Sequence, residues 1–314
     1  MKLVILEPLG VEKEKLLSMA QKTTNGTLEI EYYSTRAEDP DTLIERSKDA
    51  DVVVLTNFQY RKNIIEHCPK LKMICVAFTG VDHVDTAYCQ ERGITVCNCA
   101  GYSTVAVSEL VFGMLIDLYR HIIDCNQAVR SGGTINGMTG IEIQGKTFGV
   151  IGTGAIGLRV AAIAQALGCN ILAYSRTQKP QTGYTYVDLN TLLEQSDIVS
   201  LHIPYTAKTK GLIGTDELNR MKSNAILINA ARGPIVDYEA LSQALINKKI
   251  AGAGIDVFEM EPPIPRGHPI FKAPNVIATP HIGFATKESF EKRAVIVFQN
   301  IAAWLNGKPQ NIIV

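Results

Sequence analysis

Three short segments in the second half of the chain carry residue types that acid–base chemistry and anion binding require. They are NAARG, which contains Arg232, DVFEMEPP, which contains Asp256, Glu259 and Glu261, and TPHIG, which contains His281. An arginine can bind a carboxylate, a histidine can protonate a carbonyl oxygen, and an acid can hold that histidine protonated. Taken singly, each is more often a surface charge or a structural residue. Together they form the set that reduction of a 2-oxo acid by hydride transfer needs.

A glycine-rich segment upstream of these residues could bind the phosphates of a nucleotide. In TFGVIGTGAIG an apolar strand pattern leads into Gly152, and a helical pattern follows directly. Gly152 permits a tight turn, Gly154 lets a pyrophosphate approach the backbone, and Gly157 lets the helix pack close to the strand. We therefore expect a dinucleotide here, although on these residues alone a methyltransferase-type nucleotide site is an alternative. The predicted contacts are Gly152, Thr153, Gly154, Ala155, Ile156 and Gly157.

The segment AYSRTQK bears on which dinucleotide is preferred. About 20 residues after the glycine segment, such sites usually present an acid to the ribose 2′-OH, and this chain has Ser175 there. Serine does not repel a 2′-phosphate, and Arg176, with Thr177 and Lys179, could bind one. The missing acid also disfavours a methyltransferase. We predict a preference for NADP(H), with NAD(H) as the alternative, in which case Arg176 stacks on adenine or faces solvent.

Strands and helices alternate along the chain and must position these residues. We expect strands over residues 3–6, 28–32, 52–55, 73–76 and 95–97, and then over 147–151, 170–174, 198–201, 225–229, 252–257 and 276–278. Helical patterns cover 12–21, 42–47, 61–67, 86–91, 104–128, 155–167 and 287–305. This alternation is typical of parallel sheets covered by helices. The predicted fold class is α/β, with two doubly wound parallel-sheet domains of Rossmann-like or flavodoxin-like type.

Composition narrows the class of partner. Lysine and arginine total 31, as do aspartate and glutamate, and the net charge is zero. We find no basic run, which disfavours nucleic acid and membrane surfaces as partners. The seven cysteines include no CxxC pair, so we expect reduced structural thiols, no metal site and a cytoplasmic protein. The N-terminal MKLVILEP is interpreted as a first strand and not as a secretory signal.

The chain resembles the D-isomer-specific 2-hydroxyacid dehydrogenase family in five ordered segments, GTGAIG, LHIPYTAKTKGLI, NAARGPIVD, GAGIDVFEMEPP and TPHIG. The resemblance implies that Arg232 binds the substrate carboxylate, that His281 is the general acid/base, and that Glu261 pairs with His281. Glu259 is the weaker candidate for that pairing. Beyond the glycine segment, the predicted cofactor contacts are Ser175, Arg176, Thr177, His202, Pro204, Thr209, Ala230, Asp256 and Gly283, with Asp256 at the nicotinamide carboxamide.

The same resemblance places substrate contacts in the first third of the chain. In VAFTGVDHVD, the backbone of Phe78, Thr79 and Gly80 resembles the family's carboxylate-binding loop. In LTNFQYRKN, Asn57 should face the substrate side chain. Arg61 and Lys62 of that segment either begin a solvated helix, which we favour, or meet a phosphate.

The resemblance also implies a domain layout and a reaction. The substrate-binding domain would comprise residues 1–98 and 286–314, the dinucleotide-binding domain 99–285, and the active site the cleft between them. Residues 130–145 match the family's dimer contacts, so a homodimer is expected. The expected reaction is reduction of glyoxylate or hydroxypyruvate, by a member without a regulatory domain. The alternatives are 3-phosphoglycerate oxidation, with lactate-type and aromatic 2-oxo acids also open, and, in another class, a corepressor-like module that binds dinucleotide without turnover.

Overall fold

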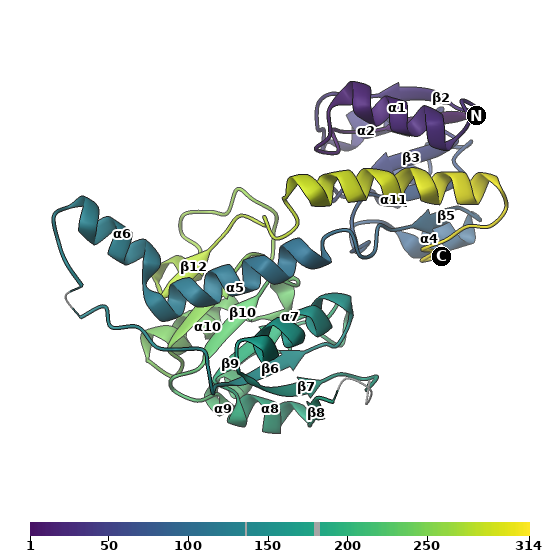
Figure 1. Ribbon diagram of the computed structural model, residues 1–314. Coiled ribbons are helices and arrows are strands. Elements are labelled where there is room, and N and C mark those ends of the chain that lie inside the picture. The colour runs from purple at the N-terminus through teal and green to yellow at the C-terminus, as the bar shows by residue number, and fades with distance from the viewer. Residues whose placement is uncertain (136, 179–182) are drawn as a thin grey trace. The chain divides into compact units, whose positions relative to one another are not determined.

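The computed structural model describes residues 1–135, 137–178 and 183–314. They form two compact units, one comprising Met1–Ser103 and Ala285–Val314, the other Thr104–Phe284 (Figure 1). The first unit thus includes residues 99–103 and 285, which the sequence analysis placed in the second. The N–H of Cys99 donates to the carbonyl oxygen of Phe78 (2.9 Å), which ties this stretch to the first unit.

The first unit is built on a five-stranded parallel sheet. Its strands are β1 (Lys2–Ile5), β2 (Glu29–Tyr32), β3 (Val52–Leu55), β4 (Met73–Val76) and β5 (Thr95–Cys97), in the order β2-β1-β3-β4-β5. Every residue of β3 and β4 is buried, which explains their uniformly apolar sequences. The helices are α1 (Lys13–Thr23), α2 (Pro40–Ser47), α3 (Lys62–Ile65), α4 (Thr86–Glu91) and α11 (Lys287–Leu305). Helix α11 packs on α1 and β4, which brings the C-terminal segment into this unit.

The second unit is built on a seven-stranded parallel sheet. Its strands are β6 (Thr147–Ile151), β7 (Asn170–Tyr174), β8 (Thr185–Tyr186), β9 (Ile198–Leu201), β10 (Ile226–Asn229), β11 (Gly252–Ile255) and β12 (Val276–Ala278), in the order β12-β11-β10-β9-β6-β7-β8. The predicted class of two parallel-sheet α/β domains is confirmed. The two-residue strand β8 was not predicted.

Helices cover both faces of this second sheet, and each face has its own apolar core. One core contains side chains of α5 (Thr104–Arg120) and α7 (Ala155–Ala166). The other contains side chains of α8 (Leu189–Gln195), α9 (Thr215–Arg220) and α10 (Tyr238–Ile246). Strands β9, β10 and β11 are buried along their whole length between the two cores.

The prediction of one continuous helix over 104–128 is wrong. The structure has α5 and then α6 (Ile122–Arg130), separated at His121, whose φ of 52° lies in the left-handed region. The Asp117 carboxylate accepts from the N–H of Ile123 (2.8 Å) and so caps the start of α6. The apolar pattern of the sequence continues through this break, so periodicity alone could not reveal that a side chain caps a second helix here.

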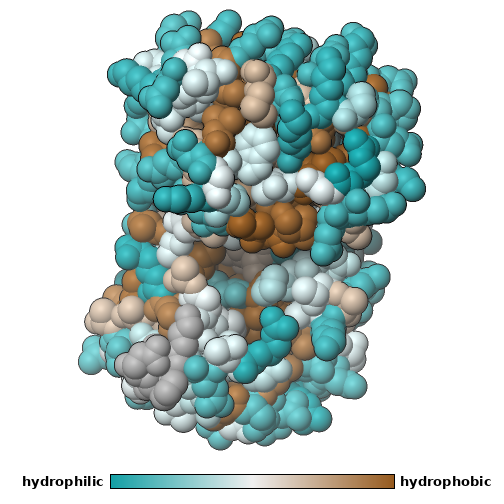
Figure 2. Space-filling view, turned by 90° about the vertical axis from the view of Figure 1, so that its right-hand side faces the viewer, coloured by the Kyte–Doolittle hydropathy of each residue, from teal (hydrophilic) through white to brown (hydrophobic). Residues whose placement is uncertain are grey.

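The surface in Figure 2 is mostly hydrophilic, and the cysteines are free thiols. On the face shown in Figure 2, hydrophilic side chains cover most of the surface, with smaller apolar patches among them. Within residues 1–135, 137–178 and 183–314, no helix combines the length and apolarity that crossing a bilayer requires. All seven cysteines are free thiols, and burial raises the pKa of Cys89 and of Cys97 to about 12.

Candidate active site

The predicted residues of the second unit lie along one edge of its sheet. Because all its strands are parallel, their carboxyl ends meet at this edge, where open α/β sheets bind ligands. The strands that follow β6 are added on one side of it up to β8, and from β9 onward on its other side. The switch point of the sheet therefore lies between β6 and β9, and the residues after these two strands flank it. Across the edge, the residues that follow the strands are His281 after β12, Asp256 after β11, Arg232 after β10, His202 after β9, Gly152 after β6 and Ser175 after β7.

The three glycines of GTGAIG occupy their positions for different structural reasons. Gly152 has a φ of 101°, and a Cβ there would come within 2.4 Å of the carbonyl oxygen of His202. A Cβ on Gly157 would lie 1.9 Å from the carbonyl oxygen of Gly152. A Cβ on Gly154 would meet no atom within 4 Å. Packing therefore requires Gly152 and Gly157, whereas Gly154 keeps a space open at the start of α7.

Two further observations indicate that this space suits a phosphate group. Thr153 is only 3% exposed, and its hydroxyl has no hydrogen-bond partner among the described residues. Helix α7 starts at Ala155 with Gly154 as its N-cap and no side-chain cap, so its first N–H groups can bind an anion. The segment from Gly152 to Gly157 fits the pyrophosphate of a dinucleotide, with the Thr153 hydroxyl as an added donor.

His202 lies on the other side of the switch point. Its N–H donates to the carbonyl oxygen of Ile151 (2.7 Å), and its Nε2 lies 2.9 Å from Oγ of Ser200. The residue keeps some solvent exposure, but desolvation of the ring lowers the pKa of His202 to about 3. His202 is thus neutral at neutral pH. In the loop that follows, the Thr209 hydroxyl donates to the carbonyl oxygen of Pro204 (2.8 Å), so Thr209 shapes the predicted cofactor loop.

Ser175 and Arg176 follow β7 beside the glycine segment. The N–H of Gly152 donates to the carbonyl oxygen of Tyr174 (2.8 Å), which joins the two chain segments immediately before Ser175. Ser175 is half-buried, and Arg176 and Thr177 are exposed. Lys179, the remaining candidate of this stretch, lies outside the described residues.

His281 and Glu261 are in direct contact. Nδ1 of His281 lies 2.8 Å from Oε2 and 3.0 Å from Oε1 of Glu261, and the His281 side chain is 14% exposed. The backbone of His281 has a φ of 56°, an uncommon conformation for a residue other than glycine. The structure therefore brings together the histidine and the acid that the resemblance paired, with Nδ1 on the carboxylate.

Glu259, the other acid of this loop, binds a different histidine. Its Oε2 lies 3.0 Å from Nε2 of His268, which is buried against the rings of Phe258 (5.3 Å) and Tyr238 (5.5 Å). Sequence reasoning did not single out His268. The HP dipeptide at 268–269, ahead of a short apolar turn, was its only signal. This second pair anchors the loop that carries Glu261.

Asp256 supports the turn that carries His281. Its carboxylate is 1% exposed and accepts from the Thr279 hydroxyl (2.6 Å) and from the N–H groups of Ile282 and Gly283 (both 2.8 Å). Burial raises the pKa of Asp256, while these hydrogen bonds and the charge of His281 act in the opposite direction. A Cβ on Gly283 would meet Oδ2 of Asp256 at 2.9 Å, so a glycine is needed for this close approach.

Arg232 lies beside the loop of the two glutamates. The side-chain nitrogen of Asn229 donates to the carbonyl oxygen of Arg232 (3.0 Å), which fixes the turn through Ala230. A Cβ on Gly233 would come within 1.8 Å of the carbonyl oxygen of Phe258, so the backbones of the two loops touch. Nη1 of Arg232 donates to the carbonyl oxygen of Ala231 (2.8 Å). The structure thus places Arg232 next to the segment leading to Glu261.

The predicted substrate residues of the first unit follow β3 and β4. Phe78 is 5% exposed, and its ring packs against Tyr102 and the guanidinium of Arg293. Its side chain therefore belongs to the core. The N–H groups of Thr79 and Gly80 donate to no acceptor within the part of the chain that the structure describes. These backbone donors are suited to binding a carboxylate.

Asn57 belongs to a polar network that sequence reasoning missed. Its side-chain oxygen accepts from Nη1 of Arg36 (2.9 Å), and the same Nη1 binds Oε2 of the buried Glu7 (2.9 Å). Arg36 lies 29 residues from Glu7 and 21 from Asn57 in sequence. Only the strand order brings the three side chains together.

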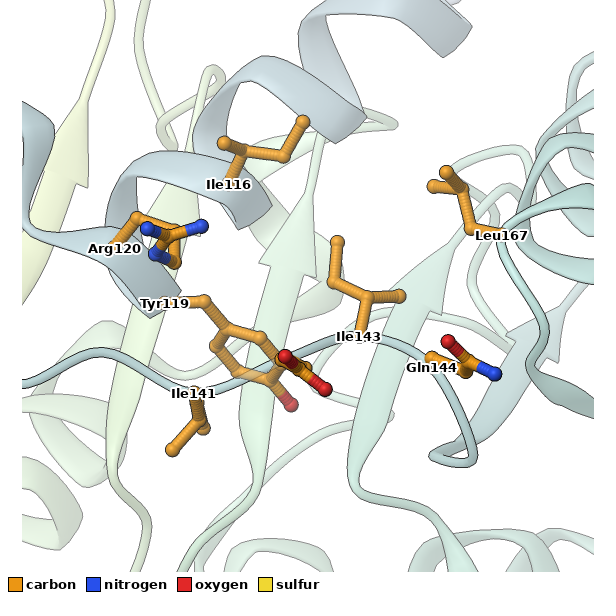
Figure 3. Close-up of a pocket in the computed structure, with 8 residues that line it drawn as sticks. Ile116, Tyr119, Arg120, Ile141, Ile143, Gln144 and Leu167 are labelled. Carbon is orange, nitrogen blue, oxygen red and sulfur yellow. The ribbon is translucent and has the colours of Figure 1, made fainter.

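A surface pocket of the second unit lies away from this chemistry. It has a volume of about 360 Å³ and is lined by Ile116, Tyr119, Arg120, Ile141, Glu142, Ile143, Gln144 and Leu167 (Figure 3). Residues 141–144 precede β6 and Leu167 precedes β7, so the pocket lies near the amino ends of the strands. None of the predicted site residues lines it.

Known proteins resemble this chain in sequence and structure. The model of the D-isomer specific 2-hydroxyacid dehydrogenase, NAD binding domain, matches residues 112–283. A glyoxylate reductase of Thermococcus litoralis is 38% identical over 96% of this chain and 97% of its own, and a glycerate dehydrogenase of Methylorubrum extorquens is 40% identical over 90% and 91%. The structure of an acyclic imino acid reductase in complex with NADPH and D-Arg superimposes with a TM-score of 0.92 at 29% identity over the full length of both chains.

Proposed function

Because this chain belongs to the D-isomer specific 2-hydroxyacid dehydrogenase family, we propose that it reduces a small 2-oxo acid, glyoxylate or hydroxypyruvate, with a preference for NADP(H). The family name defines the reaction class, which is hydride transfer between a nicotinamide dinucleotide and a 2-hydroxy acid. The direction, the substrate and the cofactor preference are our proposals.

The observation that carries the proposal is the contact between His281 and Glu261. A carboxylate at 2.8 Å from Nδ1 holds that nitrogen in a hydrogen bond and orients the ring, so that Nε2 is the nitrogen that exchanges a proton. When bound, the reduced dinucleotide supplies the hydride. His281 gives a proton to the carbonyl oxygen of the 2-oxo acid through Nε2, and takes it back in the reverse direction.

Each unit has its own candidate groups for binding a carboxylate. The guanidinium of Arg232 binds the carboxylate and stabilises charge that develops on the carbonyl oxygen. The backbone N–H groups of Thr79 and Gly80 are proposed as carboxylate donors of the first unit, with Phe78 holding the loop from the core side. Asn57 contacts the distal end of the substrate. Asp256 contacts the nicotinamide carboxamide in addition to its three structural hydrogen bonds.

The cofactor preference rests on the end of β7. Ser175 presents no negative charge to a 2′-phosphate, and Arg176 and Thr177 are exposed beside the glycine segment. A charged hydrogen bond contributes about 1.5–3 kcal/mol. This supports NADP(H); among similar solved structures, the imino acid reductase is in complex with NADPH and a D-lactate dehydrogenase of Aquifex aeolicus with NAD. His202, Pro204, Thr209, Ala230 and Gly283 complete the proposed cofactor contacts.

3-Phosphoglycerate oxidation is the weaker alternative. Arg61, the cation that could meet a phosphate, donates from Nη2 to the carbonyl oxygen of Asp82 (2.7 Å) and from Nη1 to that of Val84 (3.3 Å). Lys62 lies over the ring of Tyr88 at 5.1 Å. Both side chains thus have local structural partners, which supports a substrate without a phosphate.

We also propose a homodimer that functions in the cytoplasm. Helix α6 has no buried residue, and Ile122, Ile123 and Val129 expose more than half of their surface. A helix with such apolar exposure gains stability when a second copy covers it. The mass in solution, compared with 34.3 kDa for one chain, checks this proposal. Seven free thiols and no disulfide suit a reducing compartment.

The proposed function is tested by steady-state assays of a panel of 2-oxo acids with NADPH and NADH. We expect the highest kcat/KM for glyoxylate or hydroxypyruvate with NADPH. Tight binding of NADPH without turnover of any 2-oxo acid would overturn the proposal and support the corepressor-like alternative.

A further inference from the structure

The first unit has a switch point of its own. Its strand order β2-β1-β3-β4-β5 reverses between β1 and β3, and open α/β sheets bind ligands beyond the carboxyl ends of the strands at such a point. Glu7 follows β1, Asn57 follows β3, and Phe78 follows β4. The residues around this switch point are therefore placed to contact a ligand, and they include the proposed carboxylate-binding loop.

A buried acid fixes an arginine at this switch point. Glu7 is 3% exposed, and its Oε1 accepts from the N–H (2.9 Å) and the hydroxyl of Thr56. Its Oε2 accepts from Nη1 of Arg36 (2.9 Å). A buried carboxylate that loses its partner is costly, so Glu7 holds Arg36 in place. The guanidinium also lies over the ring of Phe58, with Cζ 5.5 Å from its centroid.

The fixed arginine sets the orientation of the Asn57 amide. Nη1 of Arg36 donates to Oδ1 of Asn57 (2.9 Å). The reverse orientation would place the NH₂ group of Asn57 against a guanidinium, which cannot accept a hydrogen bond. The amide nitrogen of the half-buried Asn57 therefore points away from Arg36 as a donor.

The local charge indicates what this donor recognises. Arg36 is flanked by Glu7 and, through Nε, by Glu38 (2.7 Å), so two negative charges surround one positive charge. Such a surrounding repels a phosphate or a second carboxylate and accommodates a neutral hydroxyl. An amide N–H can donate to the lone pair of a hydroxyl oxygen.

We propose that Asn57 binds the hydroxyl on C3 of the 2-oxo acid, and that Glu7 and Arg36 are positioning residues that hold its amide as a donor. The proposal rests on the proposed function and names the substrate class within it. The site would favour 2-oxo acids with a neutral C3 hydroxyl, such as hydroxypyruvate, over glyoxylate, which has no C3, and over substrates with a charged distal group.

The test measures the ratio of kcat/KM for hydroxypyruvate to that for glyoxylate. In Asn57→Ala we expect this ratio to fall about tenfold, the effect of losing one hydrogen bond to a substrate hydroxyl. Arg36→Met should lower the ratio similarly, mainly through KM for hydroxypyruvate. The ratio in the double variant should be no lower than in either single variant, because both substitutions act through the same contact. Glu45→Gln, which changes an exposed acid of the same unit paired with Lys48, is the control and should keep the wild-type ratio.

The outcomes separate this proposal from the proposed function. An unchanged ratio in Asn57→Ala, with the wild type active on both substrates, overturns the proposal alone. Independent, additive losses in Asn57→Ala and Arg36→Met overturn the positioning role. A wild type inactive on every 2-oxo acid overturns the proposed function and this proposal with it. If Arg36→Met fails to fold, as its thermal melting would show, the half-exposed Asn57→Ala still gives the result.

Discussion

His281 and Glu261 are joined by a hydrogen bond of 2.8 Å between Nδ1 and Oε2, although the two residues follow different strands of the sheet. The pairing depends on β11 and β12 being neighbours, because their loops then leave the sheet side by side. Two residues before Glu261, Glu259 makes a contact of the same type with the buried His268. One loop thus offers a proposed catalytic pair and a structural pair, which can be compared experimentally.

Glu261→Gln should reduce kcat for 2-oxo acid reduction by about 10- to 150-fold, the equivalent of a charged hydrogen bond. The amide keeps the shape of the side chain but removes the negative charge beside Nδ1 of His281. Glu259→Gln is the matched control, and we expect its kcat to stay within about threefold of the wild type. Equal losses of kcat in the two variants would contradict the distinct role of Glu261.

The two glycines of the phosphate segment should respond differently to alanine. Gly154→Ala adds a Cβ in open space, so we expect its melting temperature to stay within about 2 °C of the wild type, with an NADPH dissociation constant raised at least about tenfold. Gly157→Ala forces a contact with the carbonyl oxygen of Gly152 and should lower the melting temperature by several degrees. Unchanged NADPH affinity in Gly154→Ala would contradict the proposed position of the pyrophosphate.

Ser175→Asp should shift the cofactor preference toward NADH. The new carboxylate repels a 2′-phosphate and can bind a ribose 2′-OH, so the ratio of kcat/KM for NADPH to that for NADH should fall at least about tenfold. Arg176→Gln should lower the same ratio, whereas Arg220→Gln, which alters an exposed arginine paired with Glu194, should not. A tenfold preference of the wild type for NADH would show that the interpretation of this stretch is wrong.

His202 should contribute to acid sensitivity of folding. The pKa of His202 is lowered to about 3 in the folded chain, against about 6.5 in an unfolded one. Between these values the unfolded state binds more protons, so this contribution to stability is lost as pH falls from about 6.5 toward 3. In His202→Asn the melting temperature should therefore drop less between about pH 7 and pH 5 than in the wild type. Equal drops in both proteins would contradict the burial of a neutral imidazole.

Sequence patterns were informative where one strand and its following loop determine the feature. The uniformly apolar strands, the strand–glycine–helix order around Gly152, and the absence of an acid at Ser175 are all local in sequence. The break at His121 was not predicted, because the Asp117 side chain caps α6 within a continuous apolar pattern. Local sequence patterns indicate the period of a helix or strand and the residues of a turn. A cap by a side chain of the preceding helix becomes evident only in the three-dimensional structure.

Contacts between residues far apart in the sequence were either predicted from the family resemblance or not predicted at all. The preference for Glu261 over Glu259 as the partner of His281 came from the family resemblance, since both acids lie in one loop. The network of Glu7, Arg36 and Asn57 had no sequence signal, because strand order alone brings its members together. His268 was likewise missed, since a histidine in a proline-rich loop is usually exposed and this one is buried.

The central claim is that His281 exchanges the proton with the substrate, and turnover of His281→Ala tests it most directly. With the preferred 2-oxo acid and NADPH, we expect kcat to fall by roughly 10²–10⁴-fold. The dissociation constant of NADPH, measured by fluorescence titration, should change little, because the glycine segment and the end of β7 are untouched. Near-normal turnover in His281→Ala would contradict the account.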